Sequence, residues 1–255
     1  MGGFDRLPSL ALLAGGLATR LRPITTTIPK SMVEVAGEPF IAHQLRLLVR
    51  EGITDAVICA GYLGEQIEAF VGDGTSFGCH VRYSYDGKEL QGTGGALARA
   101  LPYLGGRCFV MYGDSYLDTP FRSIYETFLN TGLPALMTVF QNKGQWDASN
   151  IEFADGVIRR YDKVNRTPEM HYIDYGLSVL NTSIVSEWMP KGRFDLADLY
   201  RDLVDRHLLA GYEVPNRFYE IGSPTGLKET DALLRAKMQN RTKSNLTSRY
   251  DGEKP

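Results

Sequence analysis

Short apolar runs alternate with segments of helical periodicity through the first half of the chain. Residues 10–13, 55–60 and 108–111 are such runs, and each predicts a buried strand. Apolar positions recur at the spacing of an amphipathic helix in residues 41–49 and again in residues 67–71. Because strands that alternate with helices are typical of crossover units, the pattern predicts a largely parallel sheet.

The second half of the chain has a more mixed pattern. Residues 135–140 predict another strand, and residues 151–153 and 157–159 flank Asp155-Gly156, a strong hairpin turn pair. A hairpin places antiparallel strands next to each other. We therefore expect a mixed sheet rather than a purely parallel one.

An amphipathic helix is expected to begin at Asp195 and to end at Gly211, and a further strand is expected in residues 217–221. The chain is polar and poor in apolar anchors beyond residue 239, which indicates a loose or partner-ordered tail over 239–255. A chain of 255 residues can bury a substantial core. We expect a single α/β domain over residues 8–238, with helices flanking a mixed, mostly parallel sheet.

Composition excludes several classes of function. The formal net charge is -2, so the chain has no basic excess for a nucleic-acid backbone. No apolar segment is long enough to cross a bilayer, and we expect a cytoplasmic protein with neither nucleic acid nor membrane as partner. The 3 cysteines form no CxxC pair and indicate neither a disulfide framework nor a zinc site.

The loop after the first predicted strand carries the strongest candidate chemistry. Gly15 and Gly16 let the backbone approach a ligand without a Cβ, so that exposed N–H groups can face an anion. Arg20, Arg22 and Lys30 follow within a short span and supply cations suited to phosphate. The loop therefore predicts a polyphosphate site, although a glycine pair after a strand also fits a simple tight turn.

Two widespread phosphate-binding motifs do not match this loop. It is not closed by the Lys-Ser/Thr pair of G-x-x-x-x-G-K-[ST], and it lacks the spacing G-x-G-x-x-G.

Asp114 follows the predicted strand at 108–111, and open α/β sheets present ligands at that end of a strand. A plain Gly-Asp turn is the alternative reading of this position.

The loop resembles the signature of the sugar-1-phosphate nucleotidyltransferases. The match consists of Gly16-Leu17-Ala18-Thr19-Arg20, followed by Arg22-Pro23 and Pro29-Lys30. The family usually has glycine at the position of Ala18. Residues 10–231 follow the family's order of motifs. Their sequence pattern is similar to that of a short bacterial branch, which includes heptose-1-phosphate guanylyltransferases and N-acetylmuramate-1-phosphate uridylyltransferases. The resemblance implies a GT-A-like, Rossmann-like α/β fold.

The resemblance also implies a magnesium site and a set of catalytic residues. Asp114 matches the Gly-Asp that binds Mg²⁺ in the family, and Glu220 matches its second acidic ligand, with a surface glutamate as the alternative. Arg20 is expected to hold the triphosphate, and Lys30 to neutralise charge on the α-phosphate. Lys163 is expected to orient the incoming sugar phosphate. The expected catalytic residues are Arg20, Lys30, Lys163 and Asp114.

The family's substrate contacts map onto further positions. The expected sugar-phosphate contacts are Asp162, Asp174 and Gly176. The expected nucleotide contacts are Ala14, Gly15, Gly16, Thr19, Glu89, Gly92 and Thr93. Thr93 is also expected to cap a helix that runs to Leu101. An ionised Glu89 only accepts hydrogen bonds, which suits the N1–H and N2–H₂ edge of guanine, although the N3–H of uracil or thymine also satisfies it.

The implied reaction joins a nucleoside triphosphate to a sugar 1-phosphate, releases pyrophosphate and yields a nucleotide sugar. GTP with a heptose or hexose 1-phosphate is the favoured pair, and UTP, CTP or dTTP are alternatives. A non-catalytic relative that binds nucleotide sugars is a rival, because Ala18 and Glu220 depart from the family pattern. Self-association into a homo-oligomer is left open.

Overall fold

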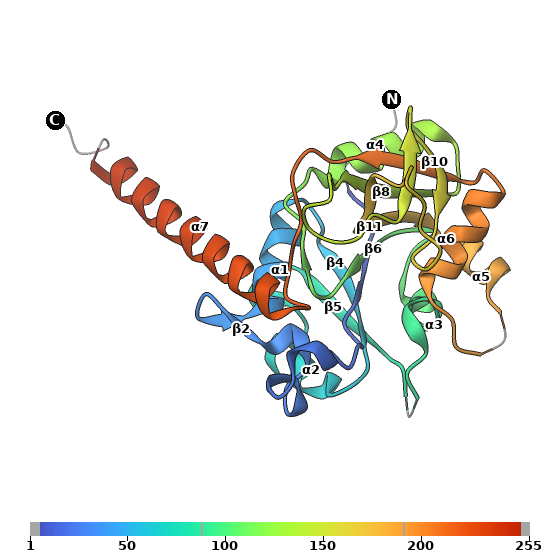
Figure 1. The fold of residues 1–255 in the computed structure, drawn as a ribbon. Coiled ribbons are helices and arrows are strands. Elements are labelled where there is room, and N and C mark those ends of the chain that lie inside the picture. The colour runs from blue at the N-terminus through green and yellow to red at the C-terminus, as the bar shows by residue number, and fades with distance from the viewer. Residues whose placement is uncertain (1–5, 88, 191, 251–255) are drawn as a thin grey trace.

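The computed structural model describes residues 6–87, 89–190 and 192–250, and over these residues its centre is a nine-stranded sheet (Figure 1). The strands of this sheet are β1 (Leu10–Leu13), β4 (Asp55–Ala60), β5 (His80–Tyr85), β6 (Arg107–Tyr112), β8 (Ala135–Gln141), β9 (Ile151–Ala154), β10 (Val157–Tyr161), β11 (Tyr172–Asn181) and β12 (Leu209–Glu213). Two short pairs lie outside it: β2 (Glu34–Val35) with β3 (Glu38–Pro39), and β7 (Ser115–Tyr116) with β13 (Tyr219–Glu220). The α-helices are α1 (Phe40–Arg50), α2 (Gly64–Val71), α3 (Gly92–Ala100), α4 (Phe121–Thr131), α5 (Thr182–Trp188), α6 (Leu196–Asp205) and α7 (Pro224–Tyr250).

The sheet is parallel in its first half and mixed in its second. The strand order is β5-β4-β1-β6-β11-β8-β12-β10-β9, in which β5, β4, β1 and β6 pair in parallel and β11 runs antiparallel to β6 and β8. β9 and β10 form the predicted hairpin, and Asp155 and Gly156 in its turn have positive φ angles of 54° and 77°. The expected α/β fold with a mixed sheet is confirmed.

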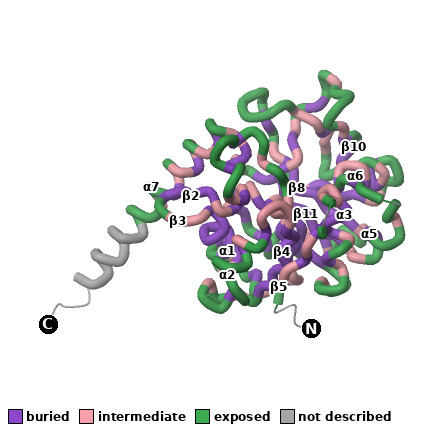
Figure 2. The backbone as a smooth tube through the Cα atoms, turned by 90° about the horizontal axis from the view of Figure 1, so that it is seen from below, coloured by how far each residue is buried: buried purple, intermediate pink, exposed green. Residues whose placement is uncertain are grey.

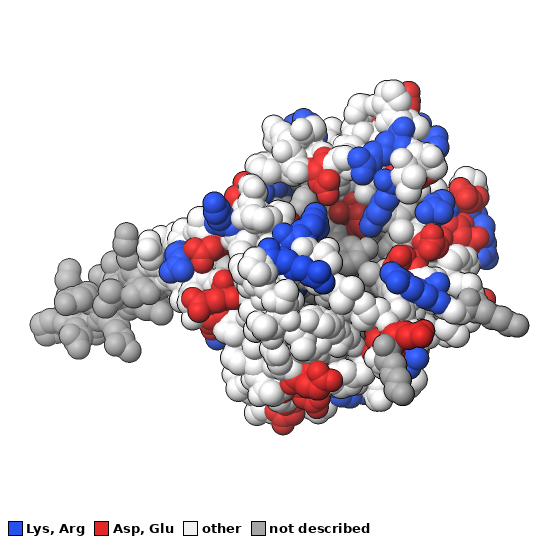
Figure 3. Space-filling model, turned by 60° about the horizontal axis from the view of Figure 1, so that its bottom comes forward, with Lys and Arg blue, Asp and Glu red and all other residues white. Residues whose placement is uncertain are grey.

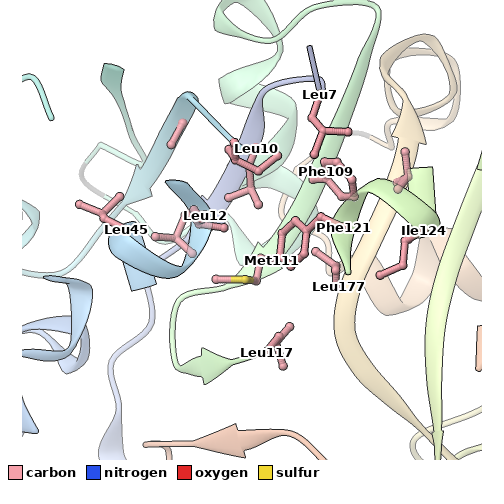
Figure 4. Close-up of a cluster of buried hydrophobic side chains, with 14 of the residues drawn as sticks. Leu7, Leu10, Leu12, Leu45, Phe109, Met111, Leu117, Phe121, Ile124 and Leu177 are labelled. Carbon is pink, nitrogen blue, oxygen red and sulfur yellow. The ribbon is translucent and has the colours of Figure 1, made fainter. Parts of the chain in front are cut away.

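One face of the sheet is covered by α1, α2 and α4. Leu10 and Leu12 of β1 and Phe109 of β6 belong to the same buried cluster as Leu45 of α1 and Phe121 of α4 (Figure 4). The Phe109 and Phe121 rings lie 5.3 Å apart and are tilted by 40°, a favourable aromatic geometry.

The opposite face of the sheet is covered by α3, α5 and α6. Because side chains alternate along a strand, Ala11 of β1 and Val110 of β6 join Leu97 of α3 and Leu199 of α6 in a second buried cluster. The result is a three-layer arrangement, and Figure 2 shows the buried backbone concentrated along the sheet strands and the helix stretches next to them.

The chain reverses its direction of travel across the sheet between β5 and β6. From β1 the chain moves outward to β4 and β5, and it then returns to the other side of β1 as β6. In open α/β sheets, ligands bind beyond the carboxyl ends of the strands at this switch point. The segments that follow β1 and β6, with Gly15-Gly16 and Gly113-Asp114, therefore meet at the same edge of the sheet.

Two predicted helix boundaries are wrong. The helix after Asp195 ends at Asp205, because residues 209–213 pair with β8 as β12 instead of continuing the helix. Gly211 lies within β12, where a Cβ would overlap the Phe153 ring, so its small size serves sheet packing rather than helix termination. The helix α3 has Gln91 at its N-cap instead of Thr93.

The last helix, α7, begins at Pro224 and continues through residue 239, where a loose tail was expected, to Tyr250. Its first turns pack through Leu227, Leu233 and Leu234 against a third buried cluster, and the helix then leads away from the body (Figure 1). The final residues of the expected tail, 251–255, lie outside the described residues. None of the helices in the described part of the chain is long and apolar enough to span a bilayer.

Gly94 allows α3 to approach the segment before α6, and this contact yields a testable prediction. A Cβ at Gly94 would overlap the Phe194 ring, whereas a Cβ at Gly106 would meet nothing within 4 Å. We expect Gly94→Ala to lower the free energy of unfolding by about 1–3 kcal/mol through overpacking, and Gly106→Ala to change it by less than about 0.5 kcal/mol. Urea unfolding of both variants measures the difference, and equal stability would contradict the packing described here.

Candidate active site

A cavity of about 450 Å³ opens at the carboxyl ends of β1 and β6. Figure 3 shows this face of the molecule hollowed near its middle, with both basic and acidic side chains around the hollow. The lining residues are Leu13, Ala14, Gly15, Gly16, Leu17, Ala18, Thr19, Lys30, Ser31, Asp86, Leu90, Gly92, Thr93, Ala96, Tyr112, Gly113, Asp114, Arg193 and Asp195. Six of the expected nucleotide contacts therefore line one cavity, and Glu89 does not.

The loop after β1 forms the glycine-rich wall of the cavity. A Cβ at Gly15 would lie 3.2 Å from the Gly61 nitrogen and 3.4 Å from Asp86 Oδ2, so the backbones after β1 and β4 approach closely here. Ala18 has a φ of 49° and a ψ of 43°, in the left-handed region that favours glycine. This backbone conformation explains why glycine suits the position, and alanine is among the smallest side chains that can occupy it.

Lys30 and Asp114 form an ion pair in the cavity wall. Lys30 begins a short 3-10 helix, Lys30–Met32, and its Nζ lies 2.7 Å from Asp114 Oδ2. The two side chains are 20% and 25% exposed, so the pair is largely withdrawn from solvent. The adjacent Ser31 hydroxyl is buried and has no hydrogen-bond partner among the described residues, which leaves it free to donate to a ligand.

Arg20, Asp114 and Glu220 converge around Gly222. The pairing of β13 with β7 sets Glu220 opposite Ser115, the residue after Asp114. A Cβ at Gly222 would lie 2.7 Å from Glu220 Oε2, 3.1 Å from Asp114 Oδ2 and 3.1 Å from Arg20 Nη2. Arg20 is thus beside the two carboxylates, although it is not part of the cavity lining.

The pair of carboxylates has the chemistry of a divalent-cation site. Glu220 accepts hydrogen bonds from the Gly222 nitrogen and the Ser223 hydroxyl, and Asp114 Oδ1 accepts one from the Ser115 hydroxyl at 3.3 Å. Mg²⁺ is usually held by one or two carboxylates together with water and substrate phosphates, so Asp114 and Glu220 fit this group. Among the described residues no three His, Cys, Asp or Glu side chains gather as a larger metal cluster.

Asp86 is a buried acidic side chain in the lining of the cavity, close to Gly15. It is 4% exposed, and its Oδ2 accepts a hydrogen bond from the Gln91 backbone nitrogen at 3.3 Å. Burial raises the pKa of the Asp86 carboxyl above its ordinary value. The exposed Glu89, three residues further on, was the expected base contact, but the structure presents Asp86 to the cavity instead.

Arg193 and Asp195 reach the cavity from the segment before α6. Asp195 caps α6 and also accepts hydrogen bonds from the Thr93 backbone nitrogen at 3.0 Å and the Thr93 hydroxyl at 3.3 Å. Phe194 packs on Gly94 and so fixes the segment against α3. Sequence reasoning missed these residues, because they are more than ninety positions away from the glycine-rich turn that they complete.

Two of the expected sugar-phosphate residues, Asp174 and Gly176, lie next to Tyr112, which itself lines the cavity. The Lys163 Nζ is 3.7 Å from Asp174 Oδ2 and 5.7 Å from the centre of the Tyr112 ring. A Cβ at Gly176 would lie 3.2 Å from the same ring. Asp162 instead accepts bonds from the Val164 and Asn165 backbone nitrogens, which lower the pKa of its carboxyl and close a local turn.

The structure thus gathers the predicted residues, apart from Glu89 and Asp162, into two adjoining groups. The first surrounds the cavity and the Asp114–Glu220 pair, and the second surrounds Lys163. Tyr112 touches both groups, and desolvation together with the nearby Asp174 and Asp114 carboxylates raises the pKa of its hydroxyl well above the ordinary value.

Comparison with known proteins gives a consistent result for most of the chain. The family model described as Nucleotidyl transferase matches residues 11–232. Over 117 residues, 46% of this chain and 51% of the relative, the chain is 41% identical to N-acetylmuramate alpha-1-phosphate uridylyltransferase from Neisseria meningitidis serogroup B. It is 26% identical over 244 residues to mannose-1-phosphate guanyltransferase from Gibberella zeae, which covers 93% of this chain and 67% of that relative. The chain therefore spans about half to two thirds of the length of these curated relatives.

A solved structure from Bacillus anthracis, assigned as a glucose-1-phosphate thymidylyltransferase, aligns with a TM-score of 0.79 and 24% identity over 89% of this chain and 95% of that one. At this identity the likeness shows the fold alone, and it agrees with the Rossmann-like α/β class. The three relatives carry three different nucleotides in their names, so they do not define the base. Because the family model matches most of the chain, including the loop after β1, Asp114 and Glu220, the chain belongs to the nucleotidyl transferase family, and the named relatives are sugar-1-phosphate nucleotidyltransferases.

Proposed function

We propose that this protein transfers a guanylyl group from GTP to a heptose or hexose 1-phosphate, with release of pyrophosphate. The observation that carries the proposal is the convergence of Arg20, Asp114 and Glu220 beside a glycine-walled cavity that also holds Lys30. Two anionic substrates must meet for this reaction. A site that combines fixed cations with a pair of carboxylates for a divalent ion meets that requirement.

The proposed chemistry is an in-line displacement at phosphorus. An oxygen of the sugar phosphate forms a bond to the α-phosphorus of GTP, and the bond from that phosphorus to the oxygen that bridges to the β-phosphate breaks. The electron pair leaves with pyrophosphate, so no covalent enzyme intermediate is needed. Arg20 holds the triphosphate, Lys30 neutralises charge at the α-phosphate, and Lys163 orients the sugar phosphate.

Asp114 and Glu220 are the residues that would hold the divalent ion, for which we propose Mg²⁺. When bound, the ion would neutralise charge on the α-phosphate and on the departing pyrophosphate. Lys30 already balances the charge of Asp114 at 2.7 Å. An incoming phosphate can take over this ammonium, which leaves the Asp114 carboxylate available to a cation.

The preference for guanine rests on Asp86. An ionised carboxylate offers only acceptors, and guanine presents N1–H and N2–H₂ as adjacent donors. Uracil and thymine offer a single N3–H between two carbonyl oxygens. Because Asp86 is 4% exposed, a base that donates twice would compensate the burial of its charge better than one that donates once. UTP, CTP and dTTP remain the alternatives that the substrate test must compare.

A substrate panel tests the proposal as a whole. The full chain is incubated with Mg²⁺, each of GTP, UTP, CTP, dTTP and ATP, and a series of hexose and heptose 1-phosphates. We expect pyrophosphate release and a nucleotide sugar of the corresponding mass, with GTP the best donor. Tight binding of a nucleotide sugar without turnover for any pair would instead support a non-catalytic relative.

Asp114→Ala and Lys30→Ala test the assigned roles. Asp114→Ala should lower kcat by more than about a hundredfold, because the pair of metal ligands is broken. Lys30→Ala should lower kcat by a similar factor while the Kd for GTP changes by less than about threefold, because the ammonium exchanges Asp114 for the phosphate with little net gain in binding and also stabilises the charge that develops during transfer. Calorimetry and steady-state kinetics measure both quantities. The exposed Lys228→Ala on α7 is the matched control and should change neither.

Asp86→Asn tests the base contact. The amide replaces an acceptor with a donor, and we expect the ratio of kcat/KM for GTP to that for UTP to fall by about tenfold or more. The parallel variant Glu89→Gln decides which of the two acids faces the base. If Glu89→Gln changes this ratio and Asp86→Asn does not, the assignment to Asp86 is wrong.

A further inference from the structure

Asp174 lies where β11 departs from regular pairing. The pairing of β11 with β8 shifts between Asp174 and Ser178, and Gly176 within this irregular stretch has a φ of 94°. The Gly176 nitrogen donates to Asp174 Oδ1 at 3.0 Å, and the Asp174 nitrogen donates to Asn150 Oδ1 at 3.2 Å. The strand irregularity therefore fixes the direction of a carboxylate that is only 7% exposed.

The second oxygen of Asp174 is also engaged by the protein. Asp174 Oδ2 accepts a hydrogen bond from the Tyr161 hydroxyl at 3.2 Å and lies 3.7 Å from the Lys163 Nζ. Burial and the Asp174 carboxylate raise the pKa of Tyr161, so this hydroxyl stays protonated and remains a donor. A carboxylate with both oxygens engaged and little exposed surface is poorly placed to bind the hydroxyls of a sugar.

Lys163 is held by its surroundings at several points. Its ammonium lies 5.6 Å from the centre of the Tyr161 ring and 5.7 Å from that of Tyr112, within the range of a cation–π contact. The side chain is still 42% exposed, so these contacts do not enclose it. A lysine on a flexible stem would otherwise sample many positions, and the fixed carboxylate of Asp174 limits them.

We propose that Asp174 is a positioning residue, which holds the Lys163 ammonium toward the phosphate of the incoming sugar and does not itself bind the sugar. The inference rests on the proposed function for the role of Lys163. It replaces the expectation that Asp174 contacts the sugar, which followed from the resemblance alone.

The negative charge of Asp174 has two opposing effects on the binding of an incoming phosphate. It repels the phosphate through space, while it improves the placement of the ammonium that the phosphate meets. Loss of the charge therefore changes ground-state binding little, because the two effects oppose each other. It lowers the rate, because in-line attack depends on the orientation of the sugar phosphate.

A double-mutant cycle tests whether Asp174 acts through Lys163. Asp174→Asn keeps the shape of the side chain and should lower kcat/KM by about tenfold with most of the loss in kcat. The single variant Lys163→Met should lower kcat/KM more than Asp174→Asn does. In the Lys163→Met background, Asp174→Asn should cause no additional loss, because the group that Asp174 positions is absent. A double variant that falls by the same additional tenfold would overturn the proposal.

Methyl phosphate separates a phosphate effect from a sugar effect. This probe carries the phosphate without sugar hydroxyls, and its binding is followed by calorimetry. We expect Asp174→Asn to change the Kd values of methyl phosphate and of the sugar 1-phosphate by the same factor. Weaker binding of the sugar 1-phosphate with an unchanged Kd for methyl phosphate would show that Asp174 binds the sugar, against the proposal.

Two further variants serve as a control and as an alternative to Asp174→Asn. Asp202 is a half-buried carboxylate on α6 that pairs with Arg206, and Asp202→Asn is the matched control that should leave the kinetics unchanged. If Asp174→Asn does not fold, Tyr161→Phe loosens the same carboxylate by removing one hydrogen bond, and its effect must likewise vanish in the Lys163→Met background. The methyl phosphate titration needs no turnover, so it shows whether Asp174 binds the sugar even if no substrate pair reacts and the proposed function fails.

Discussion

The parallel pairing of β1 with β6 is the constraint on which the site depends. It continues past the strand ends, where the Gly113 nitrogen donates to the Leu13 carbonyl at 2.9 Å. A Cβ at Gly113 would lie 2.7 Å from that carbonyl and 3.0 Å from the Ala14 Cα, so only glycine allows the two backbones to stay this close. The loop after β1 and Asp114 are thereby held together at one narrow junction.

Two lysines of the site lie beside carboxylates. Lys30 pairs with Asp114 at 2.7 Å, and Lys163 lies 3.7 Å from Asp174. Partly buried charges without partners are costly, and such pairs reduce that cost. In the proposed reaction they would also allow binding by exchange, since a phosphate that takes one of these ammonium groups does not require a new cation to be buried. The β13 segment with Glu220 completes the group of charges from a distant part of the chain.

The parts of the fold that local signals determine were predictable from the sequence. Apolar runs identified the first strands, and glycines with nearby cations identified the loop after β1. The Gly-Asp pair at the end of an apolar run identified Asp114 as a site residue. The contributions of Asp86, Arg193 and Asp195 were not predictable in this way, because tertiary packing decides which acid of a turn faces inward and which distant loop completes a wall. Tertiary pairing likewise turned Gly211 into part of a strand instead of a helix end.

The central claim is that the loop after β1, Lys30 and the Asp114–Glu220 pair form a single site for a metal-bound triphosphate. Crystals grown with GTP and Mn²⁺, measured at the manganese absorption edge, test it most directly. The account predicts an anomalous peak in contact with Asp114 and Glu220, with the triphosphate along Gly15 and Gly16. A peak away from both carboxylates, or a nucleotide bound outside the cavity, would contradict it.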